Sequence, residues 1–278
     1  TPCWFTITPI REVLMDQNKK RIVYFSHGGG PLPLLGDPGH KAMIDFMRVL
    51  PEQIARPDLI LVISAHWEEA IPTLLGSPNP PMFYDYYGFP PETYEVTYPA
   101  PGAPKAAHKI AEMLQAAGIP AQINPTRGYD HGHFIPLMIM YSEADIPTLQ
   151  LSLIRGLNPE RHLQLGEALR PLLEENVLII GSGFSFHNIS AFSWSATKAP
   201  DPANDAFQDW LIEATQHTAY ADTRHALLNW AQAPHARYCH PREEHLLPLL
   251  VCAGLAQSPA QVLFDDTILG KRGLAFGW

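Results

Sequence analysis

The chain has 278 residues, 46% of them apolar, and a formal net charge of −9 at pH 7 with its 13 histidines counted as neutral. The acidic balance argues against a nucleic-acid partner, because such a partner requires a basic face. No apolar run reaches the roughly 18 residues that would predict a membrane span, and no signal peptide is visible. The three cysteines lack zinc-ribbon spacing and fit a reducing compartment, so we predict a cytoplasmic protein.

The hydrophobic pattern predicts an α/β chain with a central, mostly parallel sheet flanked by helices. With no clear linker, we predict one domain over residues 1–278, in which residues 1–20 form a weakly patterned extension that wraps the surface. Apolar runs predict strands at 21–25, 59–64, 71–75, 121–124, 148–153, 177–180 and 267–276. Helical spacing predicts helices at 38–50, 104–117, 159–174, 205–217 and 223–230, with one more ending near 141 and another entered from 238.

Three of the apolar runs are each followed by a histidine at the expected end of the strand. Ligands of open α/β sheets bind outside the carboxyl ends of the strands, so histidines in this position predict a shared site. Neutral imidazole is the commonest metal ligand. The three are His27, with three glycines after it, His66, and His187, which follows a predicted Gly-Ser-Gly turn.

Two further segments carry candidate site residues. His245 follows Glu243 and Glu244 in what we predict to be the first turn of a helix, where the helix dipole also favours carboxylates. His131 lies between Asp130 and a glycine, and the aspartate could orient it as general bases are oriented. The remaining histidines are expected in turns, in helix caps or on the surface: His40, His108, His133, His162, His217, His225, His235 and His240.

The segment 78–101 is rich in proline and tyrosine and too irregular for a helix, so we predict a long ordered loop. Its aromatic rings fit two interpretations, a cover for a flat ligand or a surface layer packed on the core. Trp67 is a further candidate to pack a ligand ring. Arg127 could hold a substrate carboxylate, although an exposed arginine is the expected state.

The type of ligand narrows the choice of metal. Imidazoles with an optional carboxylate favour iron, zinc, copper or nickel over calcium or magnesium. Ligands on separate strand ends favour a catalytic cavity with open positions on the ion over a closed structural zinc site. No Cys-x-x-Cys or His-Glu-x-x-His motif competes with this interpretation.

Six short motifs carry a family resemblance, in one order across nearly the whole chain: SHGGGP, SAHW, TYPAPG, YDHG, SFHN and EEHLLPLL. They resemble the class III extradiol ring-cleavage dioxygenases of the LigB-like superfamily, and within it the DOPA-4,5-dioxygenase-like group. The resemblance implies an α/β fold with a metal site at the C-terminal ends of strands. It also implies an oxidoreductase that opens the aromatic ring of a catechol with O2.

Carried over residue by residue, the resemblance implies that His27, His66 and His245 hold the metal. His187 matches the histidine next to the metal, which acts as a further ligand in zinc-bound relatives or as an acid or base in turnover. His131 matches the catalytic histidine that lines the dioxygen and substrate side.

One position departs from the wider superfamily, which uses two histidines and a glutamate on iron. Here His245 occupies the position of that glutamate, and the adjacent Glu244 remains an alternative candidate for the third ligand. The implied cofactor is Fe(II) in the active enzyme, with zinc as an ion that purification can leave in its place. The implied partners are a small aromatic diol and O2, and association into a homo-oligomer is left open. Two other classes also stay open, a zinc-dependent hydrolase on the same ligands and a non-catalytic binding member of the superfamily.

Overall fold

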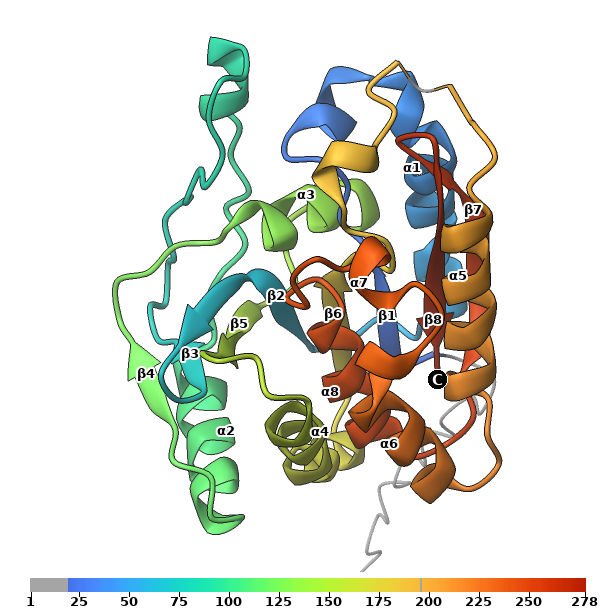
Figure 1. The fold of residues 1–278 in the computed structure, drawn as a ribbon. Helices are drawn as coiled ribbons and strands as arrows, with labels where there is room; N and C mark the ends of the chain where they lie inside the picture. The colour runs from blue at the N-terminus through green and yellow to red at the C-terminus, as the bar shows by residue number, and fades with distance from the viewer. Residues whose placement is uncertain (1–19, 196) are drawn as a thin grey trace, which may run out of the picture.

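An eight-stranded sheet forms the centre of the molecule, which a computed structural model describes for residues 20–195 and 197–278 (Figure 1). The contacts β4–β3, β5–β2, β2–β6 and β6–β1 are parallel, and the other three are antiparallel. The predicted α/β fold with a mostly parallel central sheet is therefore confirmed. In spatial order the strands are β4 (Gln122–Asn124), β3 (Thr73–Leu75), β5 (Thr148–Ile154), β2 (Leu59–Glu69), β6 (Val177–Gly183), β1 (Ile22–Ser26), β8 (Lys271–Gly277) and β7 (Gln261–Ile268).

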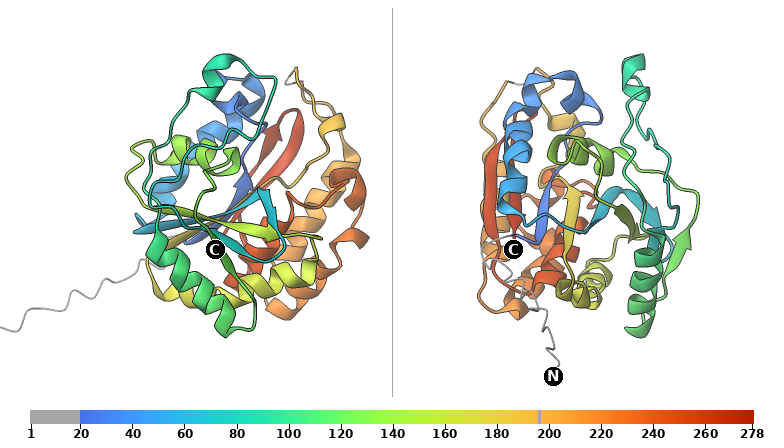
Figure 2. Two further views of the ribbon diagram at one scale, coloured as in Figure 1. Left: turned by 90° about the vertical axis from the view of Figure 1, so that its left-hand side faces the viewer. Right: turned by 180° about the vertical axis from the view of Figure 1, so that it is seen from behind.

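Helices cover both faces of this sheet (Figures 1 and 2). On one face α8 (Leu247–Ala256) packs on β1, β2 and β6 and against α4 (Pro159–Ala168). On the other face α3 (His131–Met140) packs on β2 and β6 and against α1 (Lys41–Val49). The remaining α-helices are α2 (Pro104–Ala116), α5 (Pro202–Thr215), α6 (Tyr220–Leu228) and α7 (Ala236–Cys239). Short 3-10 helices are η1 (Leu32–Leu35), η2 (Pro38–His40), η3 (Leu50–Gln53), η4 (Pro91–Tyr94), η5 (Arg170–Glu174), η6 (Ile189–Ala191) and η7 (Trp230–Gln232).

The strand β6 and the segment before α8 approach each other more closely than a side chain would allow. A Cβ atom added to Gly183 would lie 2.1 Å from the backbone oxygen of His245. That oxygen accepts hydrogen bonds from the Tyr24 hydroxyl (2.8 Å) and from the backbone N–H of Phe184 (3.0 Å). The predicted Gly-Ser-Gly turn is therefore wrong, because β6 continues through Gly183 and its glycines serve this close approach instead.

Several predicted boundaries change for identifiable reasons. The helix predicted over 159–174 ends at Ala168 and gives way to η5, whose Pro171 has no N–H to continue the pattern. The single closing strand predicted over 267–276 is a hairpin of β7 and β8, with Gly270 at φ +77° in the connection. The last α-helix begins at Leu247 rather than near 243, with a proline in its first turn.

The structure describes almost none of the predicted N-terminal extension, whereas the expectation about membrane spans can be compared with it. Of the weakly patterned extension over residues 1–20, residues 1–19 lie outside the described part of the chain. Among the residues that the structure describes, no helix is both long and apolar enough to cross a membrane.

Buried histidines are more numerous than the sequence indicated. His40, His133, His162 and His240 are all fully buried. The expectation that His40 and His162 face solvent or only cap helices is therefore wrong. His162 joins two elements, because its Nδ1 donates to the Asn158 carbonyl (2.8 Å) and its Nε2 accepts from the N–H of Ile154 (3.0 Å).

Replacing Gly183 with alanine should lower the free energy of unfolding by about 1–3 kcal/mol, because a backbone oxygen cannot move aside as a flexible side chain can. Urea denaturation of the metal-free protein measures the loss. The matched control is Gly273→Ala, whose added methyl would meet only side chains, the nearest at 3.3 Å on Phe184. Equal losses in the two variants would contradict the close approach.

The free energy of unfolding should fall as the pH is lowered from about 7.5 to about 5.5, by about 1 kcal/mol for each buried histidine. Burial lowers the pKa of His162 to about 4, and those of His133 and His240 to about 3. The unfolded chain, with histidine pKa values near 6.5, takes up protons in this interval that the folded chain does not. His162→Gln should flatten the decline, while the exposed His225→Asn should leave it unchanged. A decline of the same slope in His162→Gln would refute this account.

Candidate metal centre

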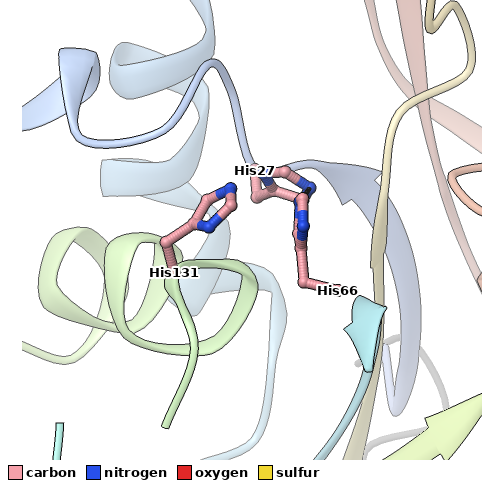
Figure 3. A group of neighbouring side chains, drawn as sticks. All are labelled: His27, His66 and His131. Atoms are coloured by element: carbon pink, nitrogen blue, oxygen red, sulfur yellow. Dashed lines mark hydrogen bonds between the residues drawn. The ribbon is translucent and has the colours of Figure 1, made fainter. Parts of the chain in front are cut away.

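The ring nitrogens of three histidines converge at one edge of the sheet. His27 follows β1, His66 lies within β2, and His245 precedes α8. The Nε2 atom of His66 lies 3.1 Å from that of His27 and 3.2 Å from that of His245. The rings of His27 and His245 are also neighbours, with centroids 5.2 Å apart. Figure 3 shows His27, from the segment after β1, facing His66 of β2, with His131 beside them.

These separations fit a shared ion. Two nitrogens bound to one ion at about 2.1 Å lie about 3.0 Å apart at a right angle and about 3.4 Å apart at the tetrahedral angle. The protonation pattern leads to the same conclusion. The Nδ1 of His245 lies 2.9 Å from Glu244 Oε1, and a carboxylate only accepts, so Nδ1 carries the proton. The Nε2 lone pair of His245 is then free, and this atom lies 3.2 Å from the Nε2 atom of His66.

All three imidazoles are held neutral by their surroundings. Burial, and next the positive charge that neighbouring histidines would carry, lower the pKa values of His27, His66 and His245 well below the ordinary value of 6.5. A histidine must be neutral to bind a metal. The donor set, its geometry and its protonation therefore fit a transition-metal ion.

The strand carrying His66 continues past the predicted end. β2 runs to Glu69, so His66 lies inside the strand and not beyond it. Its pairing with β6 nevertheless stops at Ser64, and its pairing with β5 shifts register between Ile63 and Glu68. This irregularity falls where the ring must be aimed at the site, as bulges near functional sites do.

The glycine loop after β1 is fixed by a buried histidine. The N–H of Gly29 donates to His40 Nε2 (2.9 Å), and His40 Nδ1 in turn lies 2.7 Å from an Asp37 oxygen. Gly28 has φ +83°, and a Cβ there would lie 2.8 Å from the His40 ring. The glycine run is thus needed for a left-handed turn packed against His40.

His187 packs on the face of the His245 ring, whose Nε2 edge is turned toward His66. The two rings stack with centroids 3.4 Å apart. Glu244 joins them, because its Oε1 also lies 3.2 Å from His187 Nδ1. Burial raises the pKa of Glu244, but the hydrogen bond from His187 and the charge of Arg242 outweigh it and leave the pKa lowered. Glu244 is therefore an anion that contacts the outer nitrogens of two histidines.

His131 begins α3 and completes the ring of imidazoles. Its centroid lies 3.9 Å from that of His66 and 4.9 Å from that of His27. The carboxylate that orients it is Asp85, whose Oδ1 accepts from His131 Nδ1 (2.8 Å) and from its backbone N–H (3.0 Å). The prediction that Asp130 orients this histidine is therefore wrong. Sequence reasoning missed Asp85, although it is the only acidic residue within the run MFYDYYGF of the tyrosine-rich segment.

Asp130 is the acceptor at the centre of a buried hydrogen-bond network next to the histidines. It accepts hydrogen bonds from Ser64 (2.8 Å), Gln150 (2.8 Å) and Arg127 (3.1 Å). Burial, and next the charge of Asp85, raise its pKa, which Arg127 opposes.

Arg127 is not the exposed residue that the sequence suggested. Its guanidinium lies between the rings of Trp67 and Phe83, 4.7 Å from each centroid. It also donates to the backbone oxygen of His66 (3.3 Å). Trp67, itself buried, supports this arginine and is absent from the cavity wall, so its predicted contact with a ligand ring is not seen.

A cavity of about 380 Å³ opens onto the five histidines. The tyrosine-rich segment contributes Asp85, Tyr86, Tyr87 and Phe89 to its wall, which favours the interpretation of this segment as a ligand cover. The segment extends away from the rest of the chain in Figure 1, yet its Phe89 reaches the glycine loop, since a Cβ on Gly30 would lie 3.2 Å from that ring. A larger hollow between α1 and β7 contains none of these histidines.

Comparison with known proteins agrees with this arrangement. Residues 23–270 match the family model described as the catalytic LigB subunit of aromatic ring-opening dioxygenase. The chain is 40% identical over 274 residues to dioxygenase tasH of Hapsidospora irregularis, covering 92% of this chain and 85% of that one. It is 36% identical over 256 residues to a 4,5-DOPA dioxygenase extradiol of Beta vulgaris, covering 90% and 93%. A crystal structure of an uncharacterized Escherichia coli K12 protein superposes with a TM-score of 0.75 at 26% identity, covering 93% and 99%.

The fold and the histidine cluster thus define a metal-dependent α/β enzyme. The chain belongs to the LigB family of aromatic ring-opening dioxygenases, and it is an extradiol dioxygenase similar to the DOPA dioxygenases.

Replacing Arg127 with alanine should lower the free energy of unfolding by about 3 kcal/mol, because it leaves the buried carboxylate of Asp130 without its cation. Chemical denaturation measures the change. The control is Arg56→Ala, which breaks an ion pair with Asp145 whose two side chains are more than half exposed, and it should have a much smaller effect. A loss in Arg127→Ala no larger than in the control would contradict the buried network.

Proposed function

We propose that the protein is a non-haem Fe(II) extradiol dioxygenase that opens the ring of a catechol-type substrate with O2, as the DOPA dioxygenases among its relatives are named to do. The observation that carries the proposal is the convergence of the Nε2 atoms of His27, His66 and His245, at 3.1 and 3.2 Å, on the floor of a cavity. We assign these three histidines as the metal ligands. We also propose that the chain forms a single domain with residues 1–20 as an extension, and that the protein is cytoplasmic.

Glu244 supports His245 in this assignment and does not replace it. Its Oε1 contacts Nδ1 of His245, on the side of the ring away from the other ligands. A carboxylate in this position fixes the tautomer and raises the basicity of a ligating imidazole. Asp85 stands in a looser relation to His66, with 3.7 Å between Oδ2 and Nδ1. At that distance it contributes charge and no direct hydrogen bond.

Bound iron(II) would hold the catechol oxygens and O2 together and lower the pKa of the catechol hydroxyls. The protons of those hydroxyls are then taken by this chain's own bases. Asp85 fixes the proton of His131 on Nδ1, and Glu244 contacts Nδ1 of His187. Both histidines line the cavity, and we assign them as catalytic acid and base residues, with His187 as a further ligand when zinc is bound.

The cavity walls protect the reaction from water. Tyr86 is buried and packs against the ring of His131, with centroids 5.9 Å apart. Its hydroxyl donates to the carbonyl of Thr93 (2.6 Å), which holds the ring in place. In the overall reaction both atoms of O2 enter the product, and the ring opens beside the diol to give a yellow muconic semialdehyde-type compound.

Replacing any one of His27, His66 and His245 with alanine should abolish tight Fe(II) binding and ring opening together, because each supplies one of three ligands. Anaerobic titration calorimetry with Fe(II) measures binding, and visible absorbance after addition of catechol and air measures ring opening. His225→Ala, on an exposed helix position, should retain both. Full metal binding in any of the three variants would overturn the ligand assignment.

The catalytic assignment is tested separately with His131→Ala and His187→Ala. These variants should still bind Fe(II) and should lose about 10²–10⁴-fold in kcat, the usual contribution of a positioned acid or base. Turnover at the rate of the unmodified protein would reject the assignment. An iron-loaded protein that opens no catechol, or that hydrolyses substrates with zinc and without oxygen, would reject the proposed function itself.

A further inference from the structure

The outer half of the cavity has an aromatic wall that begins at the histidines and reaches solvent. The ring of Phe192 lies 6.3 Å from that of His187 and 5.3 Å from that of Phe184, measured between centroids. Trp194 continues the series, 5.8 Å from Phe192. All of these side chains line the cavity. A ring substituent that projects outward from the histidines would therefore lie along this wall.

The end of the wall leaves large apolar groups in water. Trp194 is 55% exposed and Ile189, also in the lining, is 60% exposed. Exposed apolar groups that adjoin a cavity mark a surface that a ligand covers. The segment that carries them is anchored, since the N–H of Ser193 donates to the Leu269 carbonyl (2.8 Å) and the Asn188 amide donates to the Tyr238 carbonyl (2.8 Å).

The charges around the cavity disfavour an anionic substituent. None of the described residues that line it is lysine or arginine, and Asp85 contributes a carboxylate. The two nearby arginines are already paired. Arg127 contacts Asp130 at 3.1 Å, and Arg242 contacts Glu68 at 2.6 Å and Glu244 at 3.4 Å. A substrate carboxylate placed here would lose hydration without gaining a cation.

We propose that the preferred substrate is a catechol whose ring substituent is uncharged and apolar, and that Phe192, Trp194 and Ile189 select it. This inference rests on the proposed function and adds the class of substituent. It separates this chain from an enzyme whose main substrate is a catechol amino acid, because the carboxylate of such a substrate would meet the aromatic wall and Asp85.

The test compares two catechols of equal length, 4-propylcatechol and 3-(3,4-dihydroxyphenyl)propanoic acid, on the iron-loaded protein. The propyl compound should have at least about tenfold higher kcat/KM, as expected for apolar groups buried against an aromatic wall. Anaerobic calorimetry should give the same order of Kd values, which is a readout independent of turnover. Equal values, or a preference for the acid, would overturn the inference while the proposed function stands. Failure to open any catechol would overturn both.

Two variants and a control connect the preference to the wall. Trp194→Ala should reduce the ratio of kcat/KM for the propyl compound over the acid by several-fold. Ile189→Arg should reduce it further by raising kcat/KM for the acid, because it places a cation at the mouth of the cavity. Val49→Ala, which truncates a 48% exposed apolar side chain outside the cavity lining, should leave the ratio unchanged. An unchanged ratio in both wall variants would reject the assignment of these residues.

Discussion

The site depends on three neutral imidazoles whose ring nitrogens lie close together around His66. His245 cannot place a proton on Nε2, because Glu244 holds it on Nδ1. The Nε2 atom of His66 lies 3.1 and 3.2 Å from those of His27 and His245, which is the spacing of nitrogens that share one ion. Burial keeps all three imidazoles neutral, because it lowers the pKa of each one. The folded chain therefore presents neutral nitrogen donors that a metal ion can bind without first displacing protons from imidazolium groups.

The sheet keeps this arrangement in place. β1, β2 and β6 pair in parallel, so that His27, the outer part of β2 and the segment after β6 reach the same edge. Gly183 then allows the backbone of His245 to approach this edge from the side of α8. The carboxylates that hold the outer nitrogens, Asp85 and Glu244, come from loops. Rigid elements thus place the proposed ligands, while loops set their protonation.

Much of this could be predicted from sequence, and the failures have physical causes. Apolar runs followed by histidine identified the strand that precedes His27 and the strand that contains His66, because strands buried on both faces have nearly continuous apolar sequences. The pairing of His131 with Asp85 could not be found, since the partners are 46 residues apart and only the fold of the irregular segment brings them together. Arg127 was misjudged because burial of a charged side chain depends on a partner and two aromatic rings that periodicity does not reveal.

The connection between β7 and β8 contributes no side chain to the cavity, yet it touches both of its sides. The carbonyl of Leu269 accepts from Ser193 on the aromatic wall, and its N–H donates to Gly39, next to the histidine that fixes the glycine loop. The surroundings of the cavity are therefore complete only when this hairpin has added its strands beside β1. During synthesis a nascent chain therefore carries all five histidines before it can form the finished pocket.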